Sequence, residues 1–323
     1  MKFLITGANG FVGKPLCAEL FRRQQSVRVA VRSASLPAEN IEVAAVGSID
    51  GQTDWTEALR DVDIVIHLAA RVHMMNDTIA DPLAEFRKIN LHGTANLARQ
   101  SAHAGVKRLV YVSSIKVNGK SSLSPRLEDE QNIFTEKDIP NPQDPYGVSK
   151  WEAEQALHQV ANDTGLGVVI VRPPLIYGPG VKGNFAQMMS IVHSKIPLPF
   201  ASIRNRRSLV YLGNMTDALI TCATHPAAIG QTYLICDGED ISTPDLLRQL
   251  AAGMGVPSRL FPFPAATLKL LANFAGKSQQ MERLIGSLRI DGDKIRTDLN
   301  WIPPFTMQQG LQVTAKWQLT RHS

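Results

Sequence analysis

A short apolar segment near the start of the chain leads directly into three glycines spaced three residues apart: Lys2–Thr6 is followed by Gly7, Gly10 and Gly13. An amphipathic pattern begins near Phe11, so the order is strand, glycine-rich turn and helix, as in dinucleotide-binding sites. Gly7 and Gly10 would let backbone N–H groups approach a pyrophosphate at the positive end of the helix. Gly13 would let the helix pack closely on the strand. The sequence therefore predicts a nucleotide site at this first junction.

Strand-like and helix-like patterns alternate through the first half of the chain. Apolar runs indicate strands at residues 2–6, 26–32, 41–46, 63–68, 107–113 and 167–172, and longer periodic patterns indicate helices at 11–24, 82–104 and 146–163. Such alternation builds right-handed βαβ units and a parallel sheet covered on both faces. We expect a Rossmann-type doubly wound α/β domain over residues 1–175, with ligands beyond the carboxyl ends of its strands. Residues 176–323 are expected to form mainly a smaller C-terminal substrate lobe, with some chain returning to the first domain.

Charge and composition exclude several classes of protein. The net charge of +5 is modest and the basic residues are scattered, which favours an anionic nucleotide ligand over nucleic acid. The three cysteines are far apart and the eight histidines show no ligand spacing, so we expect neither disulfides nor a metal site. No apolar stretch reaches the roughly 18 residues of a membrane-spanning helix, and a strand at Lys2 leaves no room for a signal peptide. We therefore expect a cytoplasmic protein.

A second motif combines a tyrosine and a lysine on one predicted helix. Tyr146 and Lys150 are four residues apart, so their side chains would lie on one helix face, one turn apart. The Lys150 ammonium would lower the pKa of the Tyr146 phenol from its ordinary value of about 10, so that it could exchange a proton near neutral pH. Ser114 follows the strand at 107–113 and would bring a hydroxyl to the same sheet edge. This set suits proton transfer at a carbinol oxygen, coupled to hydride transfer at its carbon.

Six stretches of the chain together resemble the extended short-chain dehydrogenases/reductases, in particular the branch of nucleotide-sugar epimerases, dehydratases and reductases. These stretches are Thr6–Gly13, Val65–Ala70, Asn90–Thr94, Val112–Ser114, Tyr146–Lys150 and Arg172–Gly180. The resemblance implies that Tyr146 is the acid/base, that Lys150 holds the nicotinamide ribose and tunes Tyr146, and that Ser114 hydrogen-bonds the sugar oxygen. Asn90 would be a structural fourth member. The implied cofactor is NAD(H) or NADP(H), bound by Gly7, Asn9, Gly10, Phe11, Val12, Gly13, Leu68, Ala69, Ala70, Asn90, Tyr146, Lys150 and Pro173.

The same resemblance assigns a UDP-sugar to the second lobe. Asn184 and Arg207 match positions that contact the diphosphate, and Phe200 matches the region that contacts the uracil. A guanidinium suits a diphosphate because its fork of N–H donors fits two oxygens. Ordinary roles stay open for all three: a helix N-cap, a surface charge and a core aromatic. The resemblance further implies a homodimer formed through the helices at 82–104 and 146–163.

Two positions bear on the reaction. Sugar-nucleotide 4,6-dehydratases carry an Asp-Glu pair directly after the catalytic hydroxyl, whereas this chain has Ile115 and Lys116, which cannot supply that general acid. We therefore exclude dehydration, and reduction of a 4-keto sugar and 4-epimerisation stay open. The strand at 26–32 ends in Arg32 and not in an acid that would bond ribose hydroxyls. Arg32 could pair with a 2′-phosphate, which favours NADP(H) and a reductase.

Finer motifs also favour the reductase. Ser114–Gly119, Pro142–Tyr146 and Arg207–Met215 resemble the bacterial reductases that convert UDP-2-acetamido-2,6-dideoxy-4-keto-glucose into UDP-N-acetylquinovosamine for O-antigen and other surface polysaccharides. We expect this NAD(P)H-dependent reduction. The alternatives are a UDP-glucose or UDP-N-acetylglucosamine 4-epimerase with bound NAD, and a non-catalytic dinucleotide-binding protein.

One apolar segment, Leu260–Leu288, is a candidate for contact with a membrane surface. Charged residues interrupt its apolar stripe at helical spacing, namely Lys269, Lys277, Glu282 and Arg283. We therefore expect the segment to be mostly core or dimer contact.

Overall fold

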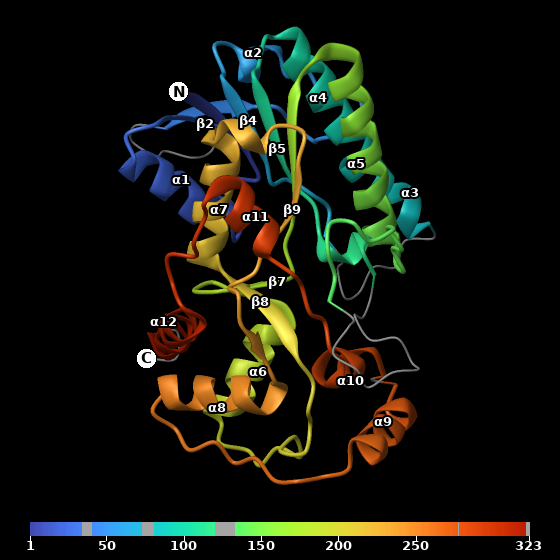
Figure 1. Cartoon of the computed structure of the whole chain (residues 1–323), viewed down its shortest axis with the longest axis vertical. Coiled ribbons are helices and arrows are strands. Elements are labelled where there is room, and N and C mark those ends of the chain that lie inside the picture. The colour runs from blue at the N-terminus through green and yellow to red at the C-terminus, as the bar shows by residue number, and fades with distance from the viewer. Residues whose placement is uncertain (34–40, 73–80, 120–132, 277, 321–323) are drawn as a thin grey trace.

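Seven parallel strands form the central sheet of the larger lobe, in the order β3-β2-β1-β4-β5-β6-β9 (Figure 1). The computed structural model describes residues 1–33, 41–72, 81–119, 133–276 and 278–320. The strands are β1 (Lys2–Thr6), β2 (Ser26–Val31), β3 (Glu42–Ala45), β4 (Ile64–His67), β5 (Arg108–Val112), β6 (Gly167–Arg172) and β9 (Thr232–Leu234). The strand order runs outward from β1 on one side and from β4 on the other. The switch point, where doubly wound sheets bind ligands, therefore lies at the carboxyl ends of these two strands.

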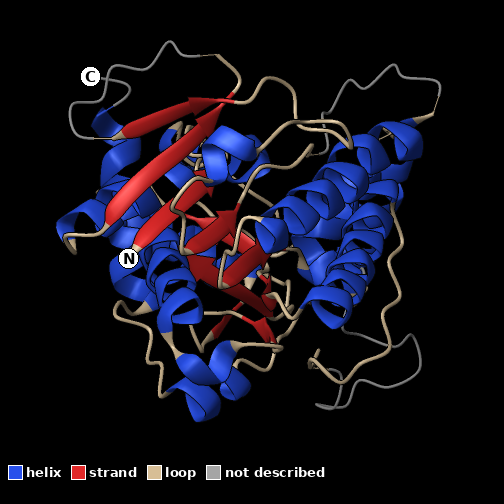
Figure 2. Ribbon diagram, turned by 90° about the horizontal axis from the view of Figure 1, so that it is seen from above, coloured by secondary structure: helices blue, strands red, loops and turns tan. Residues whose placement is uncertain are grey.

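Helices cover both faces of this sheet (Figure 2). They are α1 (Gly13–Arg22), α2 (Thr56–Leu59), α4 (Thr94–His103), α5 (Pro145–Thr164), α7 (Leu212–Thr224) and α11 (Asp293–Leu299). Phe3 and Ile5 of β1 share one buried core with α1, α7 and α11, whereas Leu4 shares the other with α2, α4 and α5. Neighbouring side chains of β1 thus lie on opposite faces of the sheet, and both faces are buried. This two-sided burial explains why the strand is apolar along most of its length.

The predicted elements of the first half are present, with small shifts at their ends. Each predicted strand end lies within one residue of the observed one. The helix predicted from residue 11 begins at Gly13, because the preceding residues belong to the glycine turn. The pattern at 82–104 is helical throughout, as α3 (Pro82–Phe86), a π-helical stretch η1 (Arg87–Gly93) and α4. Two short 3₁₀ helices are η2 (Ile115–Val117) and η3 (Pro226–Ala228).

A three-stranded sheet, β10-β8-β7, organises the second lobe. Its strands are β7 (Leu175–Tyr177), β8 (Arg207–Tyr211) and β10 (Asp240–Ile241), and the helices of this lobe are α6 (Gly183–His193), α8 (Thr243–Gly253), α9 (Ala265–Phe274), α10 (Ser278–Ile285) and α12 (Met307–Thr320). The second half of the chain also supplies α7, β9 and α11 to the larger lobe. A domain boundary near residue 175, where β7 begins, stays a prediction.

Membrane spans and metal-binding groups were both considered from the sequence, and the ranges that the structure describes contain neither. None of their helices combines the length and apolar character needed to cross a membrane. Within the same ranges, no group of three or more His, Cys, Asp or Glu side chains is placed to hold a metal ion.

Candidate active site

In the turn between β1 and α1, backbone atoms lie so close to the three glycines that a side chain would not fit there. Gly7 has φ +69°, and a Cβ added there would lie 2.9 Å from the backbone nitrogen of Ala69. A Cβ on Gly10 would lie 3.0 Å from the Gly7 carbonyl oxygen, and one on Gly13 would lie 2.2 Å from the same oxygen. The Gly10 N–H donates to that oxygen at 2.9 Å. The three glycines thus form the side-chain-free cradle that a pyrophosphate needs.

Helix α1 presents its positive end to this cradle. Its first turn holds no acidic residue and no side-chain cap, so no carboxylate of its own neutralises the helix dipole there. Asn9 is exposed in the turn, and Phe11 and Val12 are half-buried beside it. Phe11 packs against the core of the second lobe, which places the turn where the two lobes meet. The residues present therefore fit the diphosphate of a dinucleotide.

Other residues predicted for the cofactor lie along the same sheet edge. They follow strand ends directly: Arg32 follows β2, Leu68, Ala69 and Ala70 follow β4, and Pro173 follows β6. Arg32 is exposed, whereas the three residues after β4 are half-buried and Pro173 is buried. The Ala69 N–H donates to the Thr6 hydroxyl at 3.1 Å, and the Pro173 carbonyl accepts the N–H of Ile115 at 3.0 Å. These bonds fix the edge against which a cofactor would lie.

Asn90 is buried on η1 and its amide bonds to the protein itself. Its oxygen accepts the Arg71 N–H at 2.8 Å, and its nitrogen donates to the Arg71 carbonyl at 3.1 Å and to the Ser149 hydroxyl at 3.0 Å. These bonds join the loop after β4 to α5. They match the structural role implied for Asn90, and its contact with a cofactor stays a prediction.

Ser114 lies in the turn after β5, where it caps η2. Its backbone is extended, and its hydroxyl accepts the Lys116 N–H at 3.3 Å. In that bond the hydroxyl oxygen is the acceptor. Its proton can therefore be donated to an oxygen of a ligand.

Tyr146 lies in the first turn of α5. Asp144 caps this helix by accepting the Gly147 N–H at 2.7 Å, and Pro145 occupies the first helical position, where a missing N–H costs nothing. The Tyr146 ring contacts Phe86 of α3 edge to face, with centroids 5.9 Å apart. Cap and aromatic contact together fix the position of the phenol.

Lys150 lies one turn further along α5 and is buried. Its ammonium donates to the carbonyl of Val112, the last residue of β5, at 2.8 Å. It lies 4.5 Å from the ring centre of Tyr111 and 5.9 Å from that of Tyr146. Burial lowers the pKa of Lys150 to about 7, and the nearby Glu154 carboxylate counteracts part of that effect. The bond to Val112 places this lysine at the sheet edge that carries Ser114.

The expected lowering of the Tyr146 pKa is wrong for this structure. Burial raises the pKa of the phenol, and the Asp144 carboxylate raises it further. The phenol is therefore protonated at neutral pH, which is the form that can donate a proton.

Lys116 brings a second cation to Tyr146. Its ammonium forms an ion pair with Asp144 and lies 5.3 Å from the Tyr146 ring centre. In the sequence, Lys116 argues only against dehydration. Its position two residues after Ser114 could be read from the sequence. Its ion pair with Asp144, 28 residues later, depends on the fold.

A buried ion pair lies behind these residues. The Arg172 and Glu154 side chains are 5% and 0% exposed, and the Arg172 Nε donates to Glu154 at 3.0 Å. Arg172 also donates to the Asn118 side chain at 2.9 Å. The pair joins the end of β6, helix α5 and the turn that follows Ser114. This ion pair was not predicted from the sequence, although Glu154 lies one helical turn after Lys150.

A buried histidine, His67, links β1, β4 and α4. The His67 ring bonds to the Thr6 hydroxyl at 2.6 Å and to the Thr94 hydroxyl at 3.0 Å. Burial, and to a lesser extent the Lys150 charge, lower the pKa of His67 to about 3. His67 is therefore neutral at physiological pH and ties β1, β4 and α4 together.

The three residues predicted for the substrate lie on separate segments of the second lobe. Asn184 is half-buried in the first turn of α6, and Phe200 packs against the core of that lobe. Arg207 begins β8, and its guanidinium donates to the carbonyl oxygens of Arg283 at 2.6 Å and Gly286 at 3.1 Å. Burial lowers the pKa of Arg207. Arg207 is half-buried and bonded to backbone, unlike a free surface charge, and contact of any of the three with a UDP-sugar stays a prediction.

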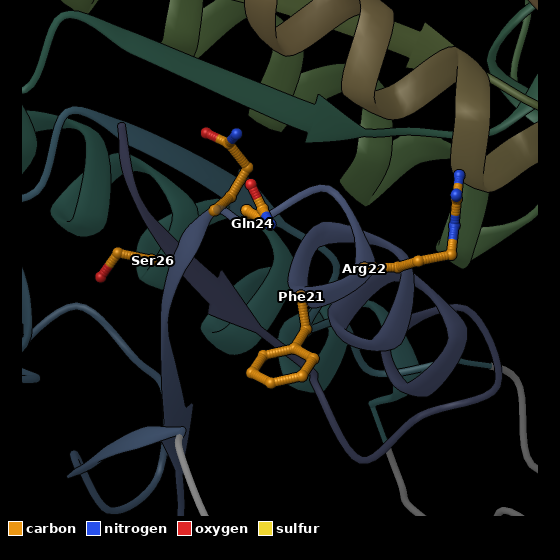
Figure 3. A pocket seen from close by; sticks show the side chains of 5 residues that line it. Phe21, Arg22, Gln24 and Ser26 are labelled. Carbon is orange, nitrogen blue, oxygen red and sulfur yellow. The ribbon is translucent and has the colours of Figure 1, made fainter.

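A cavity of about 630 Å³ lies away from this site, and Figure 3 shows the side chains that line it. It is lined by Phe21, Arg22, Gln24, Gln25 and Ser26, at the end of α1 and the start of β2. The glycine turn and Ser114 are at the carboxyl ends of the strands, whereas Ser26 is at an amino end. This cavity is therefore unrelated to the catalytic residues.

Comparison with known proteins agrees with the fold and the motifs. Residues 3–236 match the family described as "NAD dependent epimerase/dehydratase family". The chain is 42% identical over 315 residues to a UDP-glucose 4-epimerase from Vibrio cholerae, covering 97% of this chain and 94% of the relative. It is 25% identical over 332 residues to the N-acetyl-alpha-D-glucosaminyl-diphospho-ditrans,octacis-undecaprenol 4-epimerase of Escherichia coli O157:H7, covering 98% and 94%. The solved structure of MoeE5 in complex with UDP-glucose and NAD superposes with a TM-score of 0.78 at 23% identity, covering all of both chains. The chain thus belongs to the NAD-dependent epimerase/dehydratase family.

Proposed function

We propose that the protein catalyses oxidation or reduction at C4 of the sugar of a UDP-hexose. The observation that carries this proposal is the gathering of Ser114, Tyr146 and Lys150 at the carboxyl end of β5, in the sheet that holds the glycine turn. Family membership and the similarity to a UDP-glucose 4-epimerase support it. When bound, the nicotinamide would supply or accept the hydride.

The residues of the chain would handle the proton. Ser114 would donate a hydrogen bond to the C4 oxygen, and the protonated Tyr146 phenol would give that oxygen its proton during reduction. Lys150 would then stabilise the phenolate that forms, because its ammonium lies 5.9 Å from the ring centre. The glycine turn and the N-terminus of α1 would hold the diphosphate of the cofactor.

The finer proposal is reduction of a UDP-4-keto-6-deoxy-N-acetylhexosamine to UDP-N-acetylquinovosamine. Arg32 favours it, because a guanidinium at the end of β2 suits the 2′-phosphate of NADP(H), a cofactor that is exchanged at each turnover. The second candidate is 4-epimerisation with bound NAD. The 42% identity to a relative named UDP-glucose 4-epimerase favours that alternative.

Two assays separate the candidates. Purified protein is incubated with enzymatically prepared UDP-2-acetamido-2,6-dideoxy-4-keto-glucose and NADPH or NADH, and absorbance of the reduced cofactor is followed. Stoichiometric consumption is expected for the reductase. No consumption, together with interconversion of UDP-glucose or UDP-N-acetylglucosamine with its galacto epimer, would establish the epimerase. Inactivity in both assays would count against chemistry at C4.

Arg32→Asp is expected to shift cofactor preference from NADPH towards NADH. The substitution removes a charge-assisted contact with the 2′-phosphate and adds a repelling carboxylate, so the ratio of kcat/KM for NADPH over NADH should fall about tenfold or more. The matched control is Arg99→Asp, the same charge change at an exposed residue of α4. An equal ratio in both variants would mean that Arg32 does not contact the cofactor.

A further inference from the structure

Helix α9 presents large apolar side chains to solvent. It buries Leu268 and Ala272, whereas Leu270, Leu271 and Phe274 are 55%, 54% and 84% exposed. The spacing of these three residues places them on one face of the helix. We call them the α9 apolar face. The segment was expected to be mostly core or dimer contact, and this face is not core.

The α9 apolar face lies at an extremity of the molecule. In Figure 1, α9 is at the end of the second lobe that is remote from the seven-stranded sheet. Phe261, in the segment that leads into α9, is a further exposed aromatic side chain. By contrast, none of the exposed large apolar side chains found in the described residues lies on α4 or α5. Those helices were predicted to form a dimer interface, and that interface stays a prediction.

The sequence around this face is basic. Residues 246–281, which include α9, contain no Asp or Glu. Lys269 is exposed on α9 itself, and Arg259 is exposed in the segment before it. Glu282, on the neighbouring α10, is followed directly by the exposed Arg283. An apolar face with cationic neighbours complements an anionic surface that has an apolar interior.

We propose that α9 docks the protein on an anionic phospholipid surface, with Leu270, Leu271 and Phe274 entering the headgroup region. Lys269 and Arg259 then contact lipid phosphates. The helix has 10 residues, which at a rise of about 1.5 Å each is far too short to span a bilayer but suits a helix lying in its interface. This inference is independent of the proposed catalytic activity.

A second copy of the chain is a poorer occupant of this face. A two-fold contact brings the same patch of both subunits together. Lys269 and Arg259 of both subunits would then gather around one interface whose sequence surroundings are basic, and like charges across an interface are destabilising. An anionic lipid surface would instead attract Lys269 and Arg259.

Vesicle co-sedimentation of the whole protein tests the proposal. Wild type is expected to sediment with vesicles of phosphatidylcholine mixed with phosphatidylglycerol, more weakly with pure phosphatidylcholine, and less as salt increases. A triple variant, Leu270→Gln with Leu271→Gln and Phe274→Gln, should bind the anionic vesicles at least about tenfold more weakly. Lys269→Gln should weaken binding to anionic vesicles only. Thermal unfolding of the variants, whose altered side chains are exposed, should match that of wild type.

The matched control is Ile302→Gln, which removes an 80% exposed apolar side chain elsewhere on the surface and should leave vesicle binding unchanged. Wild type that stays in the supernatant with both vesicles would overturn the proposal. Equal loss of binding in the control and the triple variant would do the same. A dimer that the triple variant dissociates in size-exclusion chromatography, without vesicle binding by wild type, would assign the face to a second copy of the chain.

Discussion

Replacing Tyr146 with phenylalanine is expected to lower turnover by roughly 10²-fold or more while dinucleotide binding is retained. Such a loss corresponds to about 2.7 kcal/mol of transition-state stabilisation. The reason is that only the hydroxyl is removed. The ring keeps its edge-to-face contact with Phe86, and the Asp144 cap of α5 is unaffected. Turnover is measured by cofactor absorbance with the 4-keto substrate, and binding by titration of the intrinsic fluorescence.

The matched control is Tyr111→Phe, which removes a buried phenol hydroxyl beside the same lysine. This variant should retain most of the activity of wild type. Near-normal turnover of Tyr146→Phe, or an equal loss in both variants, would remove Tyr146 from the proton-donor role.

The pH profile gives a second readout for Tyr146. Burial raises the pKa of its phenol, so the protonated form persists through neutral pH. The rate of reduction at saturating substrate should therefore stay constant through neutral pH with respect to this group and decline only as alkaline conditions ionise the phenol. A decline that begins below neutral pH and disappears in Tyr146→Phe would contradict this assignment.

Replacing Arg172 with methionine is expected to destabilise the protein by about 3–5 kcal/mol. The substitution leaves the Glu154 carboxylate without its guanidinium partner in a position where the side chain is 0% exposed. It also removes the bond to Asn118, in the turn that follows Ser114. The free energy of unfolding is measured by urea denaturation at neutral pH.

Two further variants make this test specific. Arg60→Met breaks an ion pair with Glu57 whose side chains are 63% and 73% exposed, and exposed pairs contribute only about 0–1 kcal/mol. The double variant Arg172→Met with Glu154→Gln should recover part of the lost stability, because no buried charge then lacks its partner. A loss in Arg172→Met no larger than that in Arg60→Met would show that the buried pair does not govern stability.

Much of the larger lobe could be read from local sequence. Apolar strands of four to six residues alternating with longer amphipathic helices determine a parallel sheet with two covered faces, and the ends of the six predicted strands lie within one residue of the observed ones. The seventh strand, β9, was not predicted. The glycine turn was equally readable, because Gly13 is required by backbone contacts within its own turn. Tyr146 and Lys150 are on one helix, so their relation follows from helical spacing alone.

The rest depends on contacts between residues that are distant in the chain. Lys116 pairs with Asp144, and Arg172 with Glu154, only because β5 and β6 end at the sheet edge where α5 begins. The pKa of Tyr146 is decided by burial, which no spacing rule reports.

The packing of the second lobe likewise decides the exposure of the α9 apolar face. It also decides the hydrogen bonds from Arg207 to backbone carbonyls. The sequence by itself thus determined the main elements of the first half, their order and the glycine turn, since these rest on local propensity and periodicity. The tertiary structure alone decided charge pairing, desolvation and exposure, because these are properties of the assembled packing around each group.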